Sequence, residues 1–339
     1  MKKMCCVLTL IILFCMFLYS IPAQEQFLIY GIYYGTADNK ELWNIRWSSF
    51  DIMILHPGTP ENTYRNLNDS AFLMLMQTMR DAGVEVFLYL DIGCERDAGG
   101  MHYSKTDPRT WIAFKKDEID LFVRYADGIF FDCVGPKHRR HEYGPQFGKD
   151  VQELVDYVHY SQREVIISDL FMLMEWIEEN QPDAVPYEAD YVLFEGAWSK
   201  TPDQYSDEWS PLAAVTFANS NDFKILGMDY GRVDDEDRIM YCYCASRVMG
   251  FTGFYYAENF YDITMLDEYD LGLPLSNYTI EDALHKREFQ KGTVYVNFQA
   301  HKGWIEGEAV EEEAGISIIL VVVGFVLTLY MRTRYIYSS

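Results

Sequence analysis

Eight short runs of apolar and aromatic residues recur along residues 27–259, with start-to-start intervals of 23 to 43 residues. Most runs are nearly continuous in apolar side chains rather than alternating, which is typical of parallel strands covered on both faces. Each interval has room for a strand, a helix and two loops. Eight successive strand–helix units predict an α/β fold, a closed (β/α)₈ TIM barrel over residues 27–285.

The expected strands are residues 27–35, 50–57, 85–93, 128–135, 164–170, 191–198, 223–231 and 253–259. Helical periodicity is clear over residues 71–79, 111–125, 151–160 and 237–248. Asp107-Pro108 is typical of an N-cap followed by proline at the first helical position. After the barrel, a strand-like stretch at 293–298 and a turn at 301–303 predict a small β appendage over residues 286–307.

The first residues of the chain are typical of a secretory signal. Lys2 and Lys3 precede an apolar run over residues 7–19, and small residues follow it. We therefore expect residues 1–23 to be a signal peptide that is cleaved near Ala23. An uncleaved anchor is the alternative, although the run is short for a membrane span.

The last residues predict a membrane span. No charge interrupts residues 316–331, and Arg332 and Arg334 follow directly. Residues 315–336 are therefore expected to form a transmembrane helix with a short cytoplasmic tail, and a buried core helix is the alternative. We expect residues 308–314 to form an acidic stalk. Because Arg332 and Arg334 favour a cytoplasmic tail, we expect a single-pass membrane protein with its barrel outside, at the cell surface. The formal net charge of −24 repels nucleic acid, and it fits solubility outside the cell equally well.

Removal of the signal leaves Cys94, Cys133, Cys242 and Cys244, which allow three pairings. Cys94 and Cys133 follow neighbouring expected strands, so a bridge between them is sterically feasible. Cys242 and Cys244 are two positions apart in an expected helix and point in different directions, so they cannot hold one metal ion. We expect neither a metal site nor a cofactor.

The carboxyl ends of the strands are where a barrel of this kind places its functional groups. In chain order these ends carry Tyr33 and Tyr34, His56, Asp91, Asp132, Asp169, Glu195 with Trp198 just beyond, Asp229 and Tyr230, and Glu258 and Asn259. Six of the eight strands thus end in a carboxylate. Like charges on one rim raise each other's pKa, so that one carboxyl can stay protonated beside an ionised neighbour.

Several strands also carry motifs of one enzyme family. Residues 126–132 (Ala-Asp-Gly-Ile-Phe-Phe-Asp) resemble the fourth strand of the endo-α-1,4-polygalactosaminidase family, glycoside hydrolase family 114, and of related barrel glycosidases. Residues 88–93, 191–195 and 228–230 are similar to the third, sixth and seventh strands of that family, and residues 287–297 to the segment that often ends such barrels. The resemblance covers about residues 27–300 and implies a hydrolase of a polysaccharide or oligosaccharide, with amino sugars among the candidate substrates.

The resemblance also implies roles for particular residues. It assigns the reaction to Asp132, as nucleophile or base, and to Glu195, as acid/base, because two carboxyls flanking a glycosidic bond can divide this work. Analogy with other barrel glycosidases favours a retaining mechanism over an inverting one. The expected substrate-binding residues are Tyr33, Tyr34, His56, Asp91, Asp169, Trp198, Asp229, Tyr230 and Asn259, with Trp198 stacking on a sugar ring.

Some positions depart from the family pattern, and they leave the substrate open. Gly135 stands where the family often has an aspartate, and Ser168-Asp169 stands where its fifth strand often ends in asparagine. The basic residues 137–141 could bind uronate or sulfate groups, or form a solvated loop. A non-catalytic surface barrel that binds a glycan or a protein is the alternative function, since a fold does not certify catalysis. A metal-dependent deacetylase is disfavoured because only His56 could join the carboxylates in a metal site.

Overall fold

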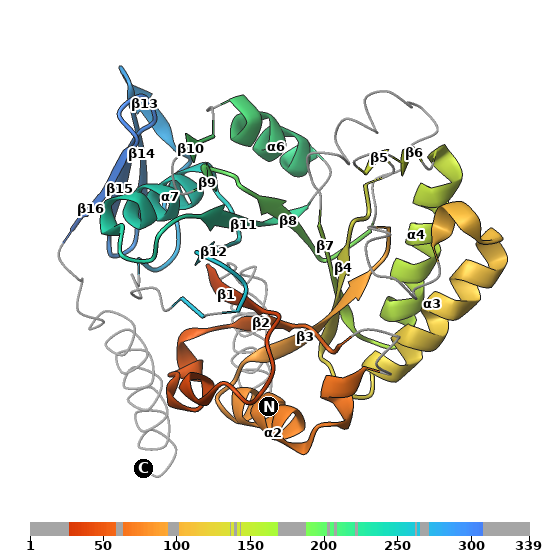
Figure 1. Ribbon diagram of the computed structural model, residues 1–339. Coiled ribbons are helices and arrows are strands. Elements are labelled where there is room, and N and C mark those ends of the chain that lie inside the picture. The colour runs from red at the N-terminus through yellow and green to blue at the C-terminus, as the bar shows by residue number, and fades with distance from the viewer. Residues whose placement is uncertain are drawn as a thin grey trace, which may run out of the picture.

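The computed structural model describes residues 27–58, 64–93, 102–135, 137–138, 141–142, 144–168, 188–201, 204–206, 209–220, 223–261, 263–264 and 271–307. Within these residues, eight parallel strands close into a barrel and the helices lie outside it (Figure 1). The predicted barrel architecture is confirmed. The predicted signal peptide, stalk and membrane helix, at residues 1–23 and 308–336, lie outside the described residues. No helix in the described ranges has the length and apolar character needed to span a bilayer.

All eight predicted strands are present in the barrel. They are β1 (Leu28–Tyr33), β2 (Ile52–Leu55), β3 (Glu85–Asp91), β4 (Gly128–Asp132), β7 (Glu164–Ile167), β8 (Tyr191–Glu195), β11 (Lys224–Tyr230) and β12 (Gly253–Ala257). Their order around the ring is β1-β12-β11-β8-β7-β4-β3-β2, so each strand pairs with its neighbours along the chain. Pairing of Leu28 with Gly253 closes the ring between β1 and β12.

Aspartates that directly precede a strand fix the register of neighbouring strands at the amino end of the barrel. The Asp51 amide donates to the Ile29 carbonyl at 2.7 Å, and its Oδ2 accepts from the Ile29 amide at 2.7 Å. The same two-point contact joins Asp127 to Val86 and Asp190 to Val165. The side chain thereby supplies an acceptor to an amide that the neighbouring strand does not reach.

The helices begin and end at residues suited to those positions. They are α2 (Ser70–Asp81), α3 (Pro108–Phe122), α4 (Gly144–Tyr160), α6 (Trp209–Ser220) and α7 (Glu236–Met249), with the 3₁₀ helices η1 (Lys40–Asn44), η2 (Trp47–Ser49), η4 (Arg65–Asn68) and η5 (Tyr103–Lys105). Asp107 caps α3 by accepting from the amides of Arg109 and Thr110, and Pro108 occupies the first turn, as predicted. Gly250 ends α7 with a φ of 82°, a conformation that favours glycine.

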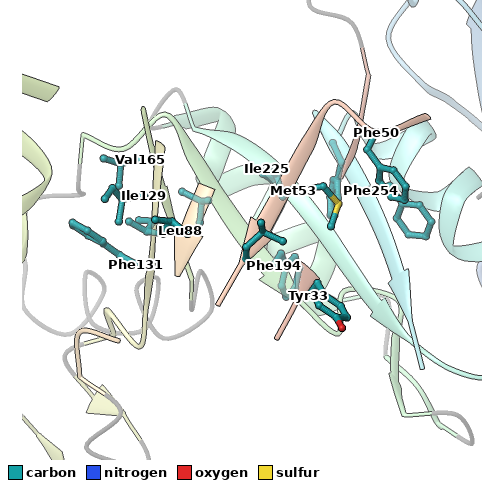
Figure 2. Close-up of a cluster of buried hydrophobic side chains, with 14 of the residues drawn as sticks. Tyr33, Phe50, Met53, Leu88, Ile129, Phe131, Val165, Phe194, Ile225 and Phe254 are labelled. Atoms are coloured by element: carbon teal, nitrogen blue, oxygen red, sulfur yellow. The ribbon is translucent and has the colours of Figure 1, made fainter. Parts of the chain in front are cut away.

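Side chains alternate between two buried regions along each strand. One set fills the inside of the barrel, where Tyr30, Phe87, Phe130 and Tyr255 pack together. The other set faces the helices; Figure 2 shows part of this outer layer, with Met53, Leu88, Phe131, Phe194 and Phe254 among its residues. Both faces of the strands are thus covered, which explains why their sequences are nearly continuous in apolar residues.

The appendage is an antiparallel sheet that begins before the predicted boundary at residue 286. It consists of β13 (Thr279–Glu281), β14 (Leu284–Phe289), β15 (Gly292–Asn297) and β16 (Lys302–Glu306), in that order. Gly303 lies so close to α7 that a Cβ there would be 2.6 Å from the Cβ of Cys244. Because the sheet covers one side of α7 and the barrel the other, nearly every residue in the second half of this helix is buried.

Two small hairpins interrupt the loops at the carboxyl end of the barrel. The predicted basic loop forms an antiparallel pair between β5 (Lys137–His138) and β6 (His141–Glu142), directly after β4. The second pair joins β9 (Ser199–Thr201) to β10 (Gln204–Tyr205) after β8.

Candidate active site

Asp132 is at the carboxyl end of β4 and shares the inner face of that strand with Phe130. Its Oδ2 accepts from the Tyr89 hydroxyl at 2.8 Å, and its Oδ1 accepts from the Cys133 amide at 2.9 Å. Tyr89 also lies on the inner face, on the neighbouring strand β3. Both carboxylate oxygens therefore have a donor, which fixes the orientation of the Asp132 side chain.

The backbone after Asp132 is held in an unusual conformation. Cys133 has a φ of 60°, and its amide also donates to the buried Ser168 hydroxyl at 2.8 Å. Cys133 is disulfide-bonded to a cysteine outside the described residues. Ser168 thus links the end of β7 to the residue that follows Asp132.

Asp91 lies beside Asp132, because the two residues are register partners at the ends of β3 and β4. The carbonyl oxygen of Asp91 accepts from the buried Lys115 ammonium at 2.6 Å. Lys115 in turn pairs with Glu118 at 2.8 Å, and Glu118 accepts from the Tyr64 hydroxyl. A buried chain of polar groups on α3 therefore supports the end of β3.

Glu195 ends β8, and its carboxylate is exposed at the mouth of the barrel. The Tyr230 hydroxyl, from the adjacent strand β11, donates to Glu195 Oε1. The chain then turns at Gly196, whose φ of 66° is in the left-handed region. The Gly196 amide donates to the Met228 carbonyl at 2.7 Å, so the turn is fixed against β11.

The aromatic floor of the site consists of Tyr34, His56, Tyr89 and Phe260, and it includes the tyrosine donor to Asp132. The Tyr34 ring contacts His56, Tyr89 and Phe260, with centroid distances of 5.5, 5.2 and 4.9 Å. The His56 ring stacks on Tyr89 at 4.9 Å, and its Nδ1 accepts from the Gly58 amide at 3.1 Å. This acceptor role places the proton of the neutral His56 ring on Nε2.

Three tyrosines of the site remain protonated. Burial first, and then the charges of Asp132, Glu195 and Asp91, raise the pKa of Tyr34 well above its ordinary value. Burial raises the pKa of Tyr89 and of Tyr230 as well, with added contributions from Asp132 at Tyr89 and from Glu195 at Tyr230. Tyr34 thus lies within range of the charges of all three carboxylates, and Tyr89 and Tyr230 are donors to two of them.

Three predicted substrate-binding residues face away from this site, and the structure corrects them. Tyr33 is 2% exposed in the outer layer, and its hydroxyl donates to the Thr36 carbonyl. Asp229 is fully buried on the outer face of β11, where it accepts from backbone amides. Trp198 is 2% exposed and stacks on Phe298 of the appendage at 5.3 Å, which leaves no ring face for a sugar.

The remaining predicted residues lie near the mouth or outside the described ranges. Tyr34, His56, Asp91 and Tyr230 belong to the arrangement around Asp132 and Glu195. Asn259 follows β12, and its Oδ1 accepts from the Tyr261 amide at 2.7 Å. Glu258 is exposed, and Asp169 is outside the described residues.

Several residues of the site were missed by the sequence analysis. Tyr89 and Lys115 hold Asp132 and Asp91, while Ser168 holds the backbone after Asp132. Tyr89 could have been found, because it is two residues before Asp91 and side chains two apart share a face of a strand. Lys115 gave no comparable signal, since a lysine in an amphipathic helix usually faces solvent.

The fold and the site define the class of this protein as a (β/α)₈ barrel with carboxylates and tyrosine donors at the carboxyl end of its strands. The described residues contain no group of three or more His, Cys, Asp or Glu placed to hold a metal ion. No protein-family model and no curated protein match the sequence.

Solved structures similar to the chain include the glycoside hydrolase domain of PelA from Pseudomonas aeruginosa. It is 13% identical, with a TM-score of 0.49, over 70% of this chain and 97% of that one. A fungal β-1,4-galactanase structure is 10% identical, with a TM-score of 0.49, over 68% and 89% of the two chains. An L-ribulose 3-epimerase is also 10% identical, with a TM-score of 0.44, over 68% and 81%. Barrels this distant carry out unrelated reactions, so the function is argued from the site.

Proposed function

We propose that the protein is a glycoside hydrolase that cleaves a polysaccharide with Asp132 and Glu195. The observation that carries the proposal is that Asp132 and Glu195 each accept from a tyrosine hydroxyl, and the two donors, Tyr89 and Tyr230, belong to one set of contacting rings with Tyr34 and Phe260. Two carboxyl groups at one barrel mouth match the requirement for acid–base and nucleophilic work on a glycosidic bond. The family motifs around residues 126–132 and 191–195 support the same pair.

The surroundings of the two carboxylates support different roles. Asp132 accepts hydrogen bonds at both oxygens, which fixes the orientation of its carboxyl group and suits a nucleophile or base. Glu195 is exposed and accepts from the Tyr230 hydroxyl at Oε1, and its exposure suits a group that exchanges its proton with substrate and water. We favour a retaining reaction, for which the carboxyls would be about 5–5.5 Å apart, over inversion at about 6.5–9.5 Å. Proton NMR of the first-formed anomer distinguishes the two.

The charge of the site favours a cationic or neutral glycan. Asp91, Asp132 and Glu195 bring three carboxylates to the mouth, whereas the nearby Lys115 ammonium faces the Asp91 carbonyl and Glu118. An ammonium group of an amino sugar would be attracted to this end of the barrel. We therefore place glycans that contain amino sugars first among candidate substrates.

An exposed aromatic residue after β12 replaces Trp198 as the candidate platform for a sugar ring. Tyr261 follows β12, at the carboxyl end of the barrel, and is 64% exposed. The Asn259 side chain holds the backbone of Tyr261. Rings that are already exposed lose little freedom on binding and offer an apolar face.

The test is a screen of polysaccharides, with and without amino sugars, in which new reducing ends are measured. We expect Asp132→Asn and Glu195→Gln each to lower kcat by at least about 10²-fold, because each removes proton or nucleophilic chemistry while keeping the shape. Asp190→Asn is the matched control, since Asp190 caps a strand at the opposite end of the barrel. Full activity in both amide variants would refute the assignment, and wild type that binds a glycan without cutting it would establish the non-catalytic alternative.

We also propose that the barrel is outside the cell and anchored by residues 315–336. The disulfide at Cys133 supports an oxidising compartment, and the uncharged run before Arg332 supports a span. The full chain should partition with membranes, and a chain ending at residue 307 should not. Recovery of both chains in the soluble fraction would refute the anchor.

A further inference from the structure

Asp229 is a fully buried carboxylate on the outer face of β11, between the barrel and α7. Its Oδ1 accepts from the Trp198 amide at 2.6 Å and from the Ser199 amide at 2.8 Å. Both donors belong to the segment that follows Glu195. Asp229 is therefore connected to the candidate catalytic carboxylate through three to four residues of backbone.

The segment after Glu195 is held by β11 at successive points. The Gly196 and Ala197 amides donate to the Met228 carbonyl at 2.7 and 3.3 Å. The Ser199 hydroxyl donates to the Tyr230 carbonyl at 2.6 Å. Together with the two contacts of Asp229, these bonds fix the turn that sets the position of the Glu195 backbone.

Neighbouring residues of β11 hold Glu195 from opposite faces of the barrel wall. Tyr230 points inward, and its hydroxyl donates to the Glu195 carboxylate. Asp229 points outward and binds the backbone behind Glu195. The position of the Glu195 carboxylate thus depends on one inward-facing and one outward-facing side chain of β11.

We propose that Asp229 is a positioning residue that sets the geometry of Glu195 by clamping residues 196–199 to β11. The proposal rests on the proposed function, because it gives Asp229 a role in the work of Glu195. It predicts that loss of Asp229 lowers the rate of the chemical step more than it weakens binding of the glycan.

The groups around Asp229 make its clamp depend on pH. The Cys242 thiol and the Arg238 guanidinium of α7 face it, and Tyr30 and Tyr256 from β1 and β12 are close enough to feel its charge. Arg238 donates to the Thr201 carbonyl and lies over the Tyr205 ring. Burial, opposed by the bonds from Trp198 and Ser199, raises the pKa of Asp229 to about 7. An ionised carboxylate accepts stronger hydrogen bonds than a neutral one, so the clamp strengthens as the pH rises through this value.

The experiment compares wild type with Asp229→Ala, Asp229→Asn and the control Asp51→Asn, all in the full chain. Asp51 is an aspartate that also accepts a backbone amide, from Ile29, but at the amino end of the barrel. Hydrogen exchange, followed by mass spectrometry, measures protection of residues 195–199. Reducing-end assays on the cleaved polysaccharide give kcat and KM between pH 5 and 9.

We expect Asp229→Ala to lose protection from hydrogen exchange over residues 195–199. Its kcat should fall about 10- to 100-fold, because a small misplacement of a catalytic group slows the chemical step. Its KM should change less than about threefold, because the glycan still binds. Asp229→Asn keeps an acceptor, so its kcat should be intermediate and should lack the ionisation near pH 7 that we expect in the wild-type profile. A nitrophenyl glycoside needs little protonation of its leaving group, so the loss should be smaller on it than on the polysaccharide. Asp51→Asn should change neither kcat nor the exchange of residues 195–199.

Two results separate failure of this inference from failure of the proposed function. If wild type cleaves a glycan and folded Asp229→Ala keeps its kcat, or Asp229→Asn keeps the wild-type pH profile, Asp229 does not position Glu195. If wild type cleaves no glycan, the proposed function fails and the inference fails with it.

Discussion

Residues that are adjacent in the sequence have separate roles in this barrel because side chains alternate along a strand. Tyr34 is part of the aromatic floor, whereas Tyr33 is buried in the outer layer. Tyr230 donates to Glu195 inside the barrel, whereas Asp229 binds backbone amides outside it. The chemistry of a strand end therefore depends on which of its last two residues points inward.

Asp229 should make folding stability depend on pH. Its pKa is about 7 in the folded protein, against an ordinary value of 3.8. Because the folded pKa is raised, the neutral carboxyl contributes stability that is complete below about pH 4 and is lost as the pH rises through 7. The difference of about 3 pKa units corresponds to about 4 kcal/mol.

Asp229→Asn removes this titration and keeps the size of the side chain. Urea unfolding at pH 5 and pH 8 should show a smaller loss of stability with pH in the variant than in wild type. Equal pH dependence in the two proteins would mean that Asp229 ionises as readily as an exposed carboxyl.

At the scale of elements, α3 supports the site through a buried ion pair. Lys115 and Glu118 are 5% and 4% exposed and 2.8 Å apart, and Lys115 also donates to the carbonyl that ends β3. Burial lowers the pKa of Lys115 and raises the pKa of Glu118. A buried ion pair is often no more stabilising than apolar residues of the same size at such an interface. We therefore infer that the role of this pair is to fix the end of β3 beside Asp132.

Lys115→Met should destabilise the protein by about 2 to 4 kcal/mol, because Glu118 and the Asp91 carbonyl each lose a buried partner. The neighbouring Lys116→Met is the matched control. Lys116 pairs with Glu153 at the surface, where both side chains are partly exposed, so its loss should change stability by less than about 1 kcal/mol. Similar urea midpoints for the two variants would contradict the buried role of Lys115.

At the scale of the whole molecule, the appendage covers α7 and the segment that follows β8. Phe298 stacks on Trp198, and the His301 ring stacks on Tyr205 at 4.0 Å. Val294 and Val296 of β15 are fully buried. Without this sheet, α7 would expose an apolar face to water, so the barrel and the appendage should unfold together.

A chain ending at residue 307 should therefore show one cooperative thermal transition by calorimetry. A chain ending at residue 278, which lacks β13 to β16, should lose that transition or show a midpoint lower by more than about 10 °C, because it exposes apolar area worth several kcal/mol. An unchanged midpoint in the shorter chain would show that the appendage is an independent unit.

The sequence by itself determined the strands, most of the helices and the closed barrel, because apolar runs and helical periodicity record burial that is local to each segment. It also placed Asp132 and Glu195 at strand ends. Only the tertiary structure decided that Tyr33, Asp229 and Trp198 face away from the site. Both faces of these strands are apolar, so no alternation in the sequence marks the inner one. The burial of Trp198 and the tyrosine donors to Asp132 and Glu195 come from segments far along the chain, which meet only when the barrel closes and the appendage packs on α7.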